Sequence, residues 1–390
     1  MTTAERTPVL LDGVRTPFGK YLKGLSTLPS RELGAQALRA LLERHEHLRR
    51  CDGVLLAQVL QGGQGQNPAR QVAASAGVDP IVPALTLNNV CLGGMAAVAD
   101  ASRRVRLGEG TSYVVGGVDS MSRAPHVGYL RQGASMSGLN LIDSLSTDGL
   151  WCALVDESMG VLSERANAEL DIDRHVQDDI ALRSHERAAA ARDAGRLAEE
   201  IVTVHVDGRT VEHDEGIRDT SRERLAALRP AFAEDGTITA GNSSQMTDGA
   251  SIGAVTSAAA AERAGTRPLA RIAGYAEVAG PDASLHLKPA VAVEQVLERA
   301  GVPLSAVALL EINEAFAGVV EASRRRLSVP LDIVNPNGGA IALGHPLGGT
   351  GFRLVLTLAR ELARRGERYG VASMCGGGGQ GAAVLLENLN

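Results

Sequence analysis

Three residues of this sequence have the chemistry of nucleophilic and acid–base catalysis, and the first is Cys91. It stands in the stretch Asn-Asn-Val-Cys-Leu-Gly-Gly (88–94), at the first turn of a predicted helix. Backbone N–H groups and the helix dipole at such a position favour the thiolate form. A free thiol with a pKa of about 8.5 is only a few per cent ionised at neutral pH, so a nucleophilic cysteine needs this help. The alternative is a small buried apolar side chain.

The second residue is His345, which lies in a glycine-dense stretch, residues 335–351, at the head of another predicted helix. A neutral imidazole there could accept a proton from a thiol or donate one to a developing oxyanion. A lone histidine is more often structural or simply solvated. The glycines and prolines around this one favour the catalytic interpretation, because they allow the backbone to approach closely.

The third residue is Cys375, which ends a predicted strand and precedes four glycines, residues 376–379. Backbone N–H groups of such a loop could bind an oxyanion or a thioester carbonyl. Dinucleotide binding is a poor alternative, because no acidic residue follows at the expected distance. Asn313 and Glu314 stand just past a further predicted strand, where such residues are usually caps.

Strands that alternate with helices are predicted to position these residues. Residues 9–11 form a predicted buried strand, and residues 30–44 have helical spacing with Ser30 as N-cap and Glu32 in the first turn. The same alternation returns in five further segments, residues 110–117, 267–276, 291–300, 307–311 and 353–365. This pattern predicts an α/β fold in which helices cover a sheet.

The chain also contains a weak internal repeat. The order Cys91, glycines, helix, Arg-Leu-Gly-Glu and strand returns as His345, glycines, helix, Arg-Arg-Gly-Glu and the strand that ends in Cys375. Two copies of one unit suggest a duplicated domain rather than an extended solenoid. The stretch 119–245 between the copies differs in composition, and we predict that it is an inserted loop domain rather than a third core.

Length and composition argue against several classes of protein. With 390 residues, 44% hydrophobic and 22% charged, the chain is expected to form two core-forming units. A formal net charge of −6 argues against nucleic acid as a partner. No apolar run is long enough to span a bilayer, and the charged residues within residues 1–20 argue against a signal peptide. Four distant cysteines without a CxxC pair argue against a zinc site or a disulfide framework, and favour reduced thiols in a cytoplasm.

Four motifs in this order resemble the thiolase family, and the resemblance runs almost from end to end. They are Asn-Val-Cys91, Asn313-Glu-Ala-Phe-Ala, Gly344-His345-Pro and Cys375-x-Gly-Gly-Gly. Supporting stretches are Arg-Thr-Pro (15–17), Gly-Gly-Val-Asp-Ser-Met-Ser-Arg-Ala-Pro-His (116–126), Leu-Arg-Pro-Ala-Phe (228–232) and Gly-Asn-Ser-Ser-Gln-Met-Thr-Asp-Gly (241–249).

The resemblance implies the thiolase fold, a duplicated and layered αβαβα core with an inserted loop domain over the substrate. It places the N-terminal half at residues 1–118, completed by residues 246–270. The inserted loop domain would then comprise residues 119–245, and the C-terminal half residues 271–390.

The resemblance also implies a two-step acyl transfer between CoA thioesters. Cys91, deprotonated by His345, would take the acyl group as a thioester. Cys375 would remove a proton from a second acetyl-CoA, whose carbanion would attack the acyl group to give a 3-ketoacyl-CoA; thiolysis is the reverse. Two oxyanion sites follow, His345 with a water held by Asn313, and the backbone N–H groups of Cys91 and Gly377. No metal or redox cofactor is needed.

Contacts with the CoA thioester follow from the same resemblance. The residues concerned are Ser244, Arg218, Phe232, Met159, Ala315, Phe316 and Leu347. Arg218 would meet a phosphate, although the spacing after it is one residue short of the family's pattern. Ser158 stands where histidine is common, and residues 279–289 replace a Met-Gly-x-Gly-Pro stretch that helps to shape the acyl pocket.

Within the family, the stretch 121–146 resembles that of short-chain members and favours formation or cleavage of acetoacetyl-CoA. A thiolase of longer chain-length range in β-oxidation is the alternative. A catalytically silent acyl-CoA-binding protein would not need all four reacting groups. Condensing enzymes that act on carrier proteins pair their cysteine with other motifs, and the sterol-carrier branch has histidine in place of Asn313.

We further expect a homodimer or homotetramer, with the 120–145 loop as the contact that joins dimers. Small acyl-CoA molecules would be its substrates, in the fatty acid metabolism of a cytoplasm, without nucleic acid or membrane as partners.

Overall fold

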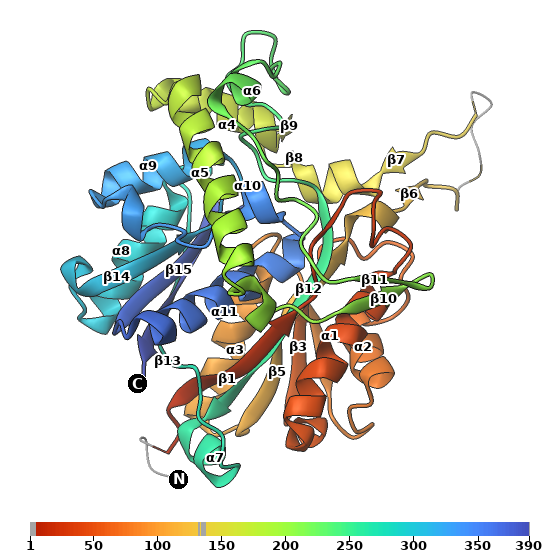
Figure 1. Cartoon of the computed structure of the whole chain (residues 1–390). Helices are drawn as coiled ribbons and strands as arrows, with labels where there is room; N and C mark the ends of the chain where they lie inside the picture. Colours follow the sequence, from red (N-terminus) through yellow and green to blue (C-terminus); the bar gives the residue numbers. More distant parts are fainter. Residues whose placement is uncertain (1–4, 132, 134–137, 390) are drawn as a thin grey trace.

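A computed structural model describes residues 5–131, 133 and 138–389 (Figure 1). Its main feature is a ten-stranded sheet. Nine strands follow one another in the order β14-β15-β16-β13-β1-β12-β5-β3-β4, and the tenth, β2, pairs with β12. The strand bounds are β1 Pro8–Arg15, β2 Gly19–Lys20, β3 Gly53–Ala57, β4 Ala84–Leu87, β5 Ser112–Ser120, β12 Thr247–Ser257, β13 Ala270–Ala279, β14 Val307–Ile312, β15 Tyr369–Gly376 and β16 Gln380–Asn388.

The sheet consists of two units that meet at β1 and β13. Only Val9 with Arg271 and Leu10 with Ala270 pair at this junction. Within each unit, by contrast, neighbouring long strands pair over seven to nine positions. Each unit also has a parallel pair at its outer edge, β3 with β4 and β14 with β15. The two units are therefore similar halves, as the internal repeat indicates.

Helices cover both units in three layers, which gives the predicted αβαβα arrangement (Figure 1). Helices α1 and α2 lie outside the N-terminal unit, α8 and α9 lie outside the C-terminal unit, and α3 and α11 lie between the two. The helix bounds are α1 Ser30–Arg44, α2 Pro68–Ala76, α3 Gly93–Leu107, α7 Ala258–Arg263, α8 Lys288–Ala300, α9 Ala317–Leu327, α10 Ala340–Leu343 and α11 Leu347–Arg365.

The strands are apolar on both faces because helices cover both faces. In β1, Val9 and Leu11 pack in the core under α1, whereas Leu10 points the other way into the central core around α3 and α11. In β16, Val384 belongs to the central core and its neighbour Leu385 to the core under α8. Successive side chains of a strand alternate between its faces, so a continuous apolar run supplies two cores at once.

Helices α3 and α11 cross in direct backbone contact at glycines. A Cβ atom on Gly94 would lie 2.7 Å from the backbone nitrogen of Phe352 and 2.9 Å from the carbonyl oxygen of Gly348. One on Gly351 would lie 2.6 Å from the backbone nitrogen of Met95. Because no side chain separates the helices here, their first turns lie side by side.

Between β5 and β12, the described residues form three α-helices and three short two-stranded sheets. Helix α5 packs against two clusters: Ile180 and Ala181 join the C-terminal core, and Ala188 and Ala191 form a smaller separate cluster with Phe18. The predicted boundaries at residues 119 and 245 stay a prediction. The elements are β6 His126–Val127, β7 Ile142–Asp143, β8 Trp151–Cys152, β9 Glu157–Ser158, α4 Met159–Glu169, α5 Arg174–Asp193, β10 Val204–Val206, β11 Arg209–Val211 and α6 Arg222–Ala226.

Arg15 joins this segment to the end of β1. Its guanidinium is fully buried and donates to both carboxylate oxygens of Asp214, at 2.6 and 2.8 Å, and to Glu200 at 2.8 Å. A buried charge needs such partners, because desolvation without them is costly. The Arg-Thr-Pro stretch of the sequence thus has a structural role.

One local prediction was wrong. Helix α1 begins at Ser30, but Pro29 occupies the N-cap position and no side chain caps the helix. The Ser30 hydroxyl instead accepts a hydrogen bond of 3.1 Å from the backbone N–H of Ser120, at the end of β5. A long-range partner therefore replaced the local one that the sequence suggested.

None of the helices in the described ranges is both long and apolar enough to cross a bilayer.

The glycine contact between α3 and α11 can be tested by Gly94→Ala. We expect the free energy of unfolding to fall by about 1–3 kcal/mol, because the new methyl group meets backbone atoms that cannot rotate away. Asp100→Ala, on the partly exposed side of the same helix, should change it by about 0.5 kcal/mol or less. Denaturant unfolding measures both. A Gly94→Ala protein more stable than the parent, as helix propensity alone would predict, would contradict the contact.

Candidate active site

A cavity of about 670 Å³ lies between the segment that joins β5 to β12, the Cys91 turn before α3 and the start of α11. Its walls include eleven of the twelve site residues that the sequence predicts; the twelfth, Asn313, lies outside them. The eleven are Cys91, His345, Cys375, Gly377, Ser244, Arg218, Phe232, Met159, Ala315, Phe316 and Leu347.

Cys91 sits in a tight turn before α3 rather than in the first turn of that helix, which begins at Gly93. Val90, just before it, has a left-handed φ of +46°, a strained conformation for a β-branched residue. The Asn88 side chain accepts a hydrogen bond of 3.1 Å from the Val90 N–H, and the Asn89 amide donates to Glu277 at 2.6 Å. These contacts hold the turn that presents the thiol to the cavity.

His345 contacts the Cys91 thiol and has a defined tautomer. Its Nε2 lies 3.3 Å from the Cys91 sulfur, and its Nδ1 lies 2.6 Å from the Thr350 hydroxyl oxygen. The Thr350 hydroxyl donates its only hydrogen to the carbonyl oxygen of Pro346, at 2.8 Å. It must therefore accept from the imidazole, which places the hydrogen on Nδ1 and leaves Nε2 free to take the thiol proton.

Burial keeps both members of this pair neutral at rest. It raises the pKa of Cys91 to about 12, and the nearby Asp119 carboxylate adds to this. Burial and the positive charge of Arg353 lower the pKa of His345 to about 3. Hydrogen bonds from the backbone N–H groups of Cys91 and Gly377 act in the opposite direction on the thiol, because they favour the thiolate.

Cys375 lies near the end of β15, where the chain turns through glycines into β16. Burial raises the pKa of this thiol, and the closeness of Cys91 raises it further. The two cysteines are therefore neighbours in the cavity although they come from different halves. Neither of them is in a disulfide.

Asn313 is fully buried just past β14, and its backbone N–H donates to the carbonyl oxygen of Ser373 at 2.9 Å. Within the described part of the chain, neither side-chain atom of Asn313 has a hydrogen-bond partner. Its expected role, to hold a water near His345, stays a prediction.

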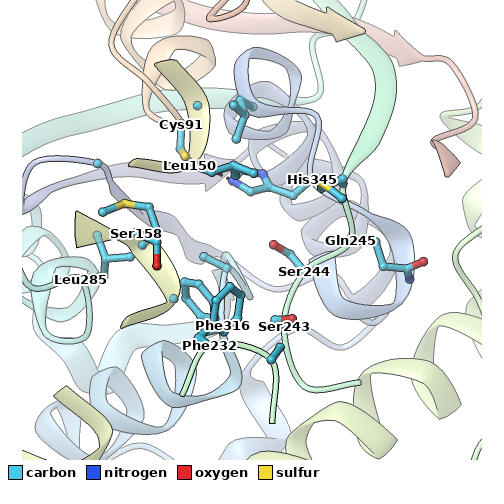
Figure 2. A pocket seen from close by; sticks show the side chains of 18 of the residues that line it. Cys91, Leu150, Ser158, Phe232, Ser243, Ser244, Gln245, Leu285, Phe316 and His345 are labelled. Carbon is cyan, nitrogen blue, oxygen red and sulfur yellow. Dashed lines mark hydrogen bonds between the residues drawn. The ribbon is translucent and has the colours of Figure 1, made fainter. Parts of the chain in front are cut away.

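Apolar side chains form much of the remaining cavity wall (Figure 2). The rings of Phe232 and Phe316 meet edge to face with their centres 6.0 Å apart, and Ser244 lies on the neighbouring wall. Ser158, where the family often has histidine, accepts a hydrogen bond from the Val161 N–H and caps α4. Leu285, from the divergent 279–289 stretch, lines the cavity and belongs to the same apolar cluster as Met159 and Phe316.

Several cavity residues were not predicted from the sequence. Lys20, Trp151 and Leu285 line the cavity. Asp119 lies behind it: burial raises its pKa to about 6, and its carboxylate accepts from the backbone N–H of Leu60 at 2.9 Å and of Gly348 at 2.7 Å. The sequence could have indicated the role of Thr350, because a hydroxyl in the first turn of a helix that follows a histidine can form a hydrogen bond with the histidine ring.

Comparison with known proteins agrees with this geometry. The family model of the thiolase N-terminal domain matches the sequence over residues 8–259, and the family model of the thiolase C-terminal domain matches it over residues 266–388. The chain belongs to the thiolase family. A crystal structure of the Bacillus anthracis acetyl-CoA acetyltransferase superposes on this thiolase with a TM-score of 0.95 and 34% identity over 100% of both chains.

Curated relatives are similar over almost the full length of the thiolase. A probable acetyl-CoA acetyltransferase of Mycolicibacterium smegmatis is 44% identical over 97% of this chain and 100% of its own. The acetyl-CoA acetyltransferase of Paracoccus denitrificans is 40% identical over 97% and 98%. In the described ranges of this thiolase, no three His, Cys, Asp or Glu residues are grouped so that they could hold a metal ion.

Thr350→Val tests the assignment of the tautomer. Without a hydroxyl acceptor for Nδ1–H, the imidazole can change tautomer or rotate, so we expect kcat for thiolysis to fall by about ten- to a hundredfold. Thr350→Ser keeps the oxygen and should retain most of the activity. Steady-state kinetics of both variants measure this. Equal activity of the valine and serine variants would show that the hydrogen bond has no catalytic effect.

The pH dependence of Cys91 alkylation tests the neutral pair. At pH values between the lowered pKa of His345 and the raised pKa of Cys91, the two side chains together hold one proton, and the fraction of Cys91 present as thiolate does not change with pH. The rate of alkylation by iodoacetamide should therefore be constant from about pH 5 to about pH 9. In His345→Ala only the free thiolate reacts, and the rate should rise by about tenfold per pH unit.

Mass spectrometry of the Cys91 peptide follows this reaction without interference from the other thiols. A parent enzyme whose rate rises through a midpoint near the ordinary thiol pKa of about 8.5 would contradict the pairing.

Proposed function

We propose that this thiolase catalyses the reversible condensation of two acetyl-CoA molecules to acetoacetyl-CoA and CoA, through an acyl group on Cys91. The observation that carries the proposal is the 3.3 Å contact between the Cys91 sulfur and His345 Nε2, the ring nitrogen that the Thr350 contact at Nδ1 leaves available to accept a proton. A second thiol, Cys375, stands beside this pair in the same cavity. The names of the relatives support the same reaction.

In the first half-reaction, His345 Nε2 takes the Cys91 proton as the sulfur attacks the acetyl carbonyl carbon. The backbone N–H groups of Cys91 and Gly377 would stabilise the tetrahedral oxyanion. As the intermediate collapses, the CoA sulfur leaves and takes a proton from Cys375. The products are acetyl-Cys91, CoA, an imidazolium at His345 and a thiolate at Cys375, so charge and protons balance.

In the second half-reaction, the Cys375 thiolate removes a proton from the methyl group of a second acetyl-CoA. His345, with a water held by Asn313, would stabilise the enolate oxygen. The carbanion attacks the acetyl carbonyl on Cys91, and the Cys91 sulfur leaves and regains its proton from His345. Acetoacetyl-CoA departs, and both thiols are protonated again.

The acyl end of the cavity supports a short substrate. Met159, Leu285, Ile238 and Phe316 pack around Cys375 as one apolar cluster of buried or half-buried side chains. An acetyl group needs no more room than the space between the two thiols, whereas a long acyl chain would displace this wall. We therefore prefer acetoacetyl-CoA over longer 3-ketoacyl-CoA as the cleaved substrate.

The setting of the reaction is part of the proposal. We place it in the fatty acid metabolism of a cytoplasm, with CoA thioesters as substrates and no further cofactor, in a homodimer or homotetramer. The 120–145 loop would join dimers, although residues 132 and 134–137 lie outside the described part of the chain. On either side of them Tyr129 and Leu139 are exposed apolar side chains, 89% and 59% accessible, as expected of an interface.

The proposal is tested by thiolysis of acetoacetyl-CoA and of a longer 3-ketoacyl-CoA, with mass spectrometry for an acyl adduct on the Cys91 peptide. We expect cleavage mainly of acetoacetyl-CoA, and an adduct that disappears in Cys91→Ser. Cys375→Ser should keep acyl transfer to Cys91 but lose condensation by about a hundredfold or more. Preference for the longer substrate would overturn only the proposed preference for a short acyl chain. Absence of turnover and of adduct with both substrates would overturn the activity.

A further inference from the structure

The loop Gly376–Gly379 has one side-chain hydrogen bond within its own hairpin, from the Gln380 amide to the carbonyl oxygen of Gly377 at 3.0 Å. It joins β15 to β16 and carries the Gly377 N–H that faces Cys91. Gly378 and Gly379 have φ values of +79° and +69°, which glycine adopts without strain. Four consecutive glycines also have the greatest backbone freedom, and an oxyanion donor works only if it is held in place beforehand.

The segment that follows β13, the strand paired with β16, supports the loop from outside. The backbone N–H of Gly280, directly after β13, donates to the carbonyl oxygen of Gly379 at 3.0 Å. The fit is close, because a Cβ atom on Gly379 would lie 2.0 Å from the carbonyl oxygen of Asp282. Segment 280–282 therefore limits where the glycine loop can move.

Lys288 holds this supporting segment in turn. Its Nζ donates to the carbonyl oxygen of Gly280 at 2.9 Å and to the carboxylate of Asp282 at 3.0 Å. The residue is only 4% exposed although it carries a charge. Its own backbone packs against Gly381, where a Cβ atom would lie 2.5 Å from the Lys288 carbonyl oxygen. Lys288 thus contacts both segment 280–282 and the start of β16.

The position of this lysine is unfavourable for a cation in two respects. It is the first residue of α8, where the helix dipole disfavours positive charge, and its ammonium group is removed from most of the solvent. The hydrogen bonds to segment 280–282 offset both costs. Lys288 lies in the 279–289 stretch, which replaces the Met-Gly-x-Gly-Pro stretch expected from the family resemblance.

We propose that Lys288 is a positioning residue for catalysis, which fixes segment 280–282 against the Gly376–Gly379 loop and so keeps the Gly377 N–H directed at Cys91. This inference rests on the proposed function, because it assigns Gly377 to the oxyanion site. Lys288 is not among the cavity-lining residues, so it acts through the loop and not on the substrate.

Lys288→Met, of similar length and without charge, tests the proposal in the full-length enzyme. We expect kcat for thiolysis of acetoacetyl-CoA to fall by about tenfold or more, with KM unchanged within about twofold, because the transition state alone uses the oxyanion donor. The alkylation rate of Cys91 by iodoacetamide should fall by about threefold or more, because the Gly377 hydrogen bond favours the thiolate. Lys288→Arg, which keeps a positive charge and N–H donors, should lose less of both values than Lys288→Met.

Two further variants separate positioning from general stability. Asp282→Asn removes one charged acceptor and keeps the Gly280 carbonyl, so its effect should have the same direction and be smaller. Arg326→Met removes an exposed cation that pairs with Glu294 on α8, and should leave kcat and alkylation unchanged. Thermal unfolding of each variant shows whether it is folded.

Unchanged kcat and alkylation in a folded Lys288→Met would overturn the proposal. A lowered thermal midpoint with equal losses in the methionine and arginine variants would also overturn it, since that pattern indicates packing alone. If the parent enzyme does not cleave acetoacetyl-CoA but the difference in alkylation remains, the proposed function fails and the positioning role stands.

Discussion

The backbone contact between α3 and α11 is the constraint on which the site depends. Because Gly94 meets Phe352 and Gly348 without an intervening side chain, the two helices begin side by side at the centre of the molecule. This brings Cys91 and His345, 254 positions apart in the chain, to 3.3 Å. The central core around the crossing draws residues from both halves, so each half contributes one member of the Cys91–His345 pair and neither half can form the site alone.

The chemistry of the pair follows from its burial. Low polarity around the crossing disfavours both the thiolate and the imidazolium, and so the resting pair is neutral. The proton is already directed along the sulfur–nitrogen contact, because Thr350 fixes the tautomer of His345. Charge needs to appear only when the substrate carbonyl is attacked, at a point where backbone N–H groups are in place to receive it.

Charged side chains outside the motifs support the loops that carry these backbone groups. Asp119 binds the first turn of α11 through the Gly348 N–H, Glu277 binds the cysteine turn through Asn89, and Lys288 binds the segment behind the glycine loop. In each case a charged group from a different element bonds to a helix start, a turn or a loop close to the reacting groups. The glycines give the loops their shape, and these contacts restrict their motion.

The sequence alone determined the secondary structure of the frame and the identity of the reacting groups. Alternating apolar strands and helices predicted an α/β fold, because strand and helix periodicity are local properties. The resemblance carried by the Cys91, His345 and Cys375 motifs implied which side chains would meet. Tertiary structure alone decided that the Ser30 hydroxyl bonds to β5 instead of capping α1, that Thr350 sets the histidine tautomer, and that Lys288 reaches back to Gly280. These outcomes depend on partners brought together by folding, and no local pattern records which distant groups will meet.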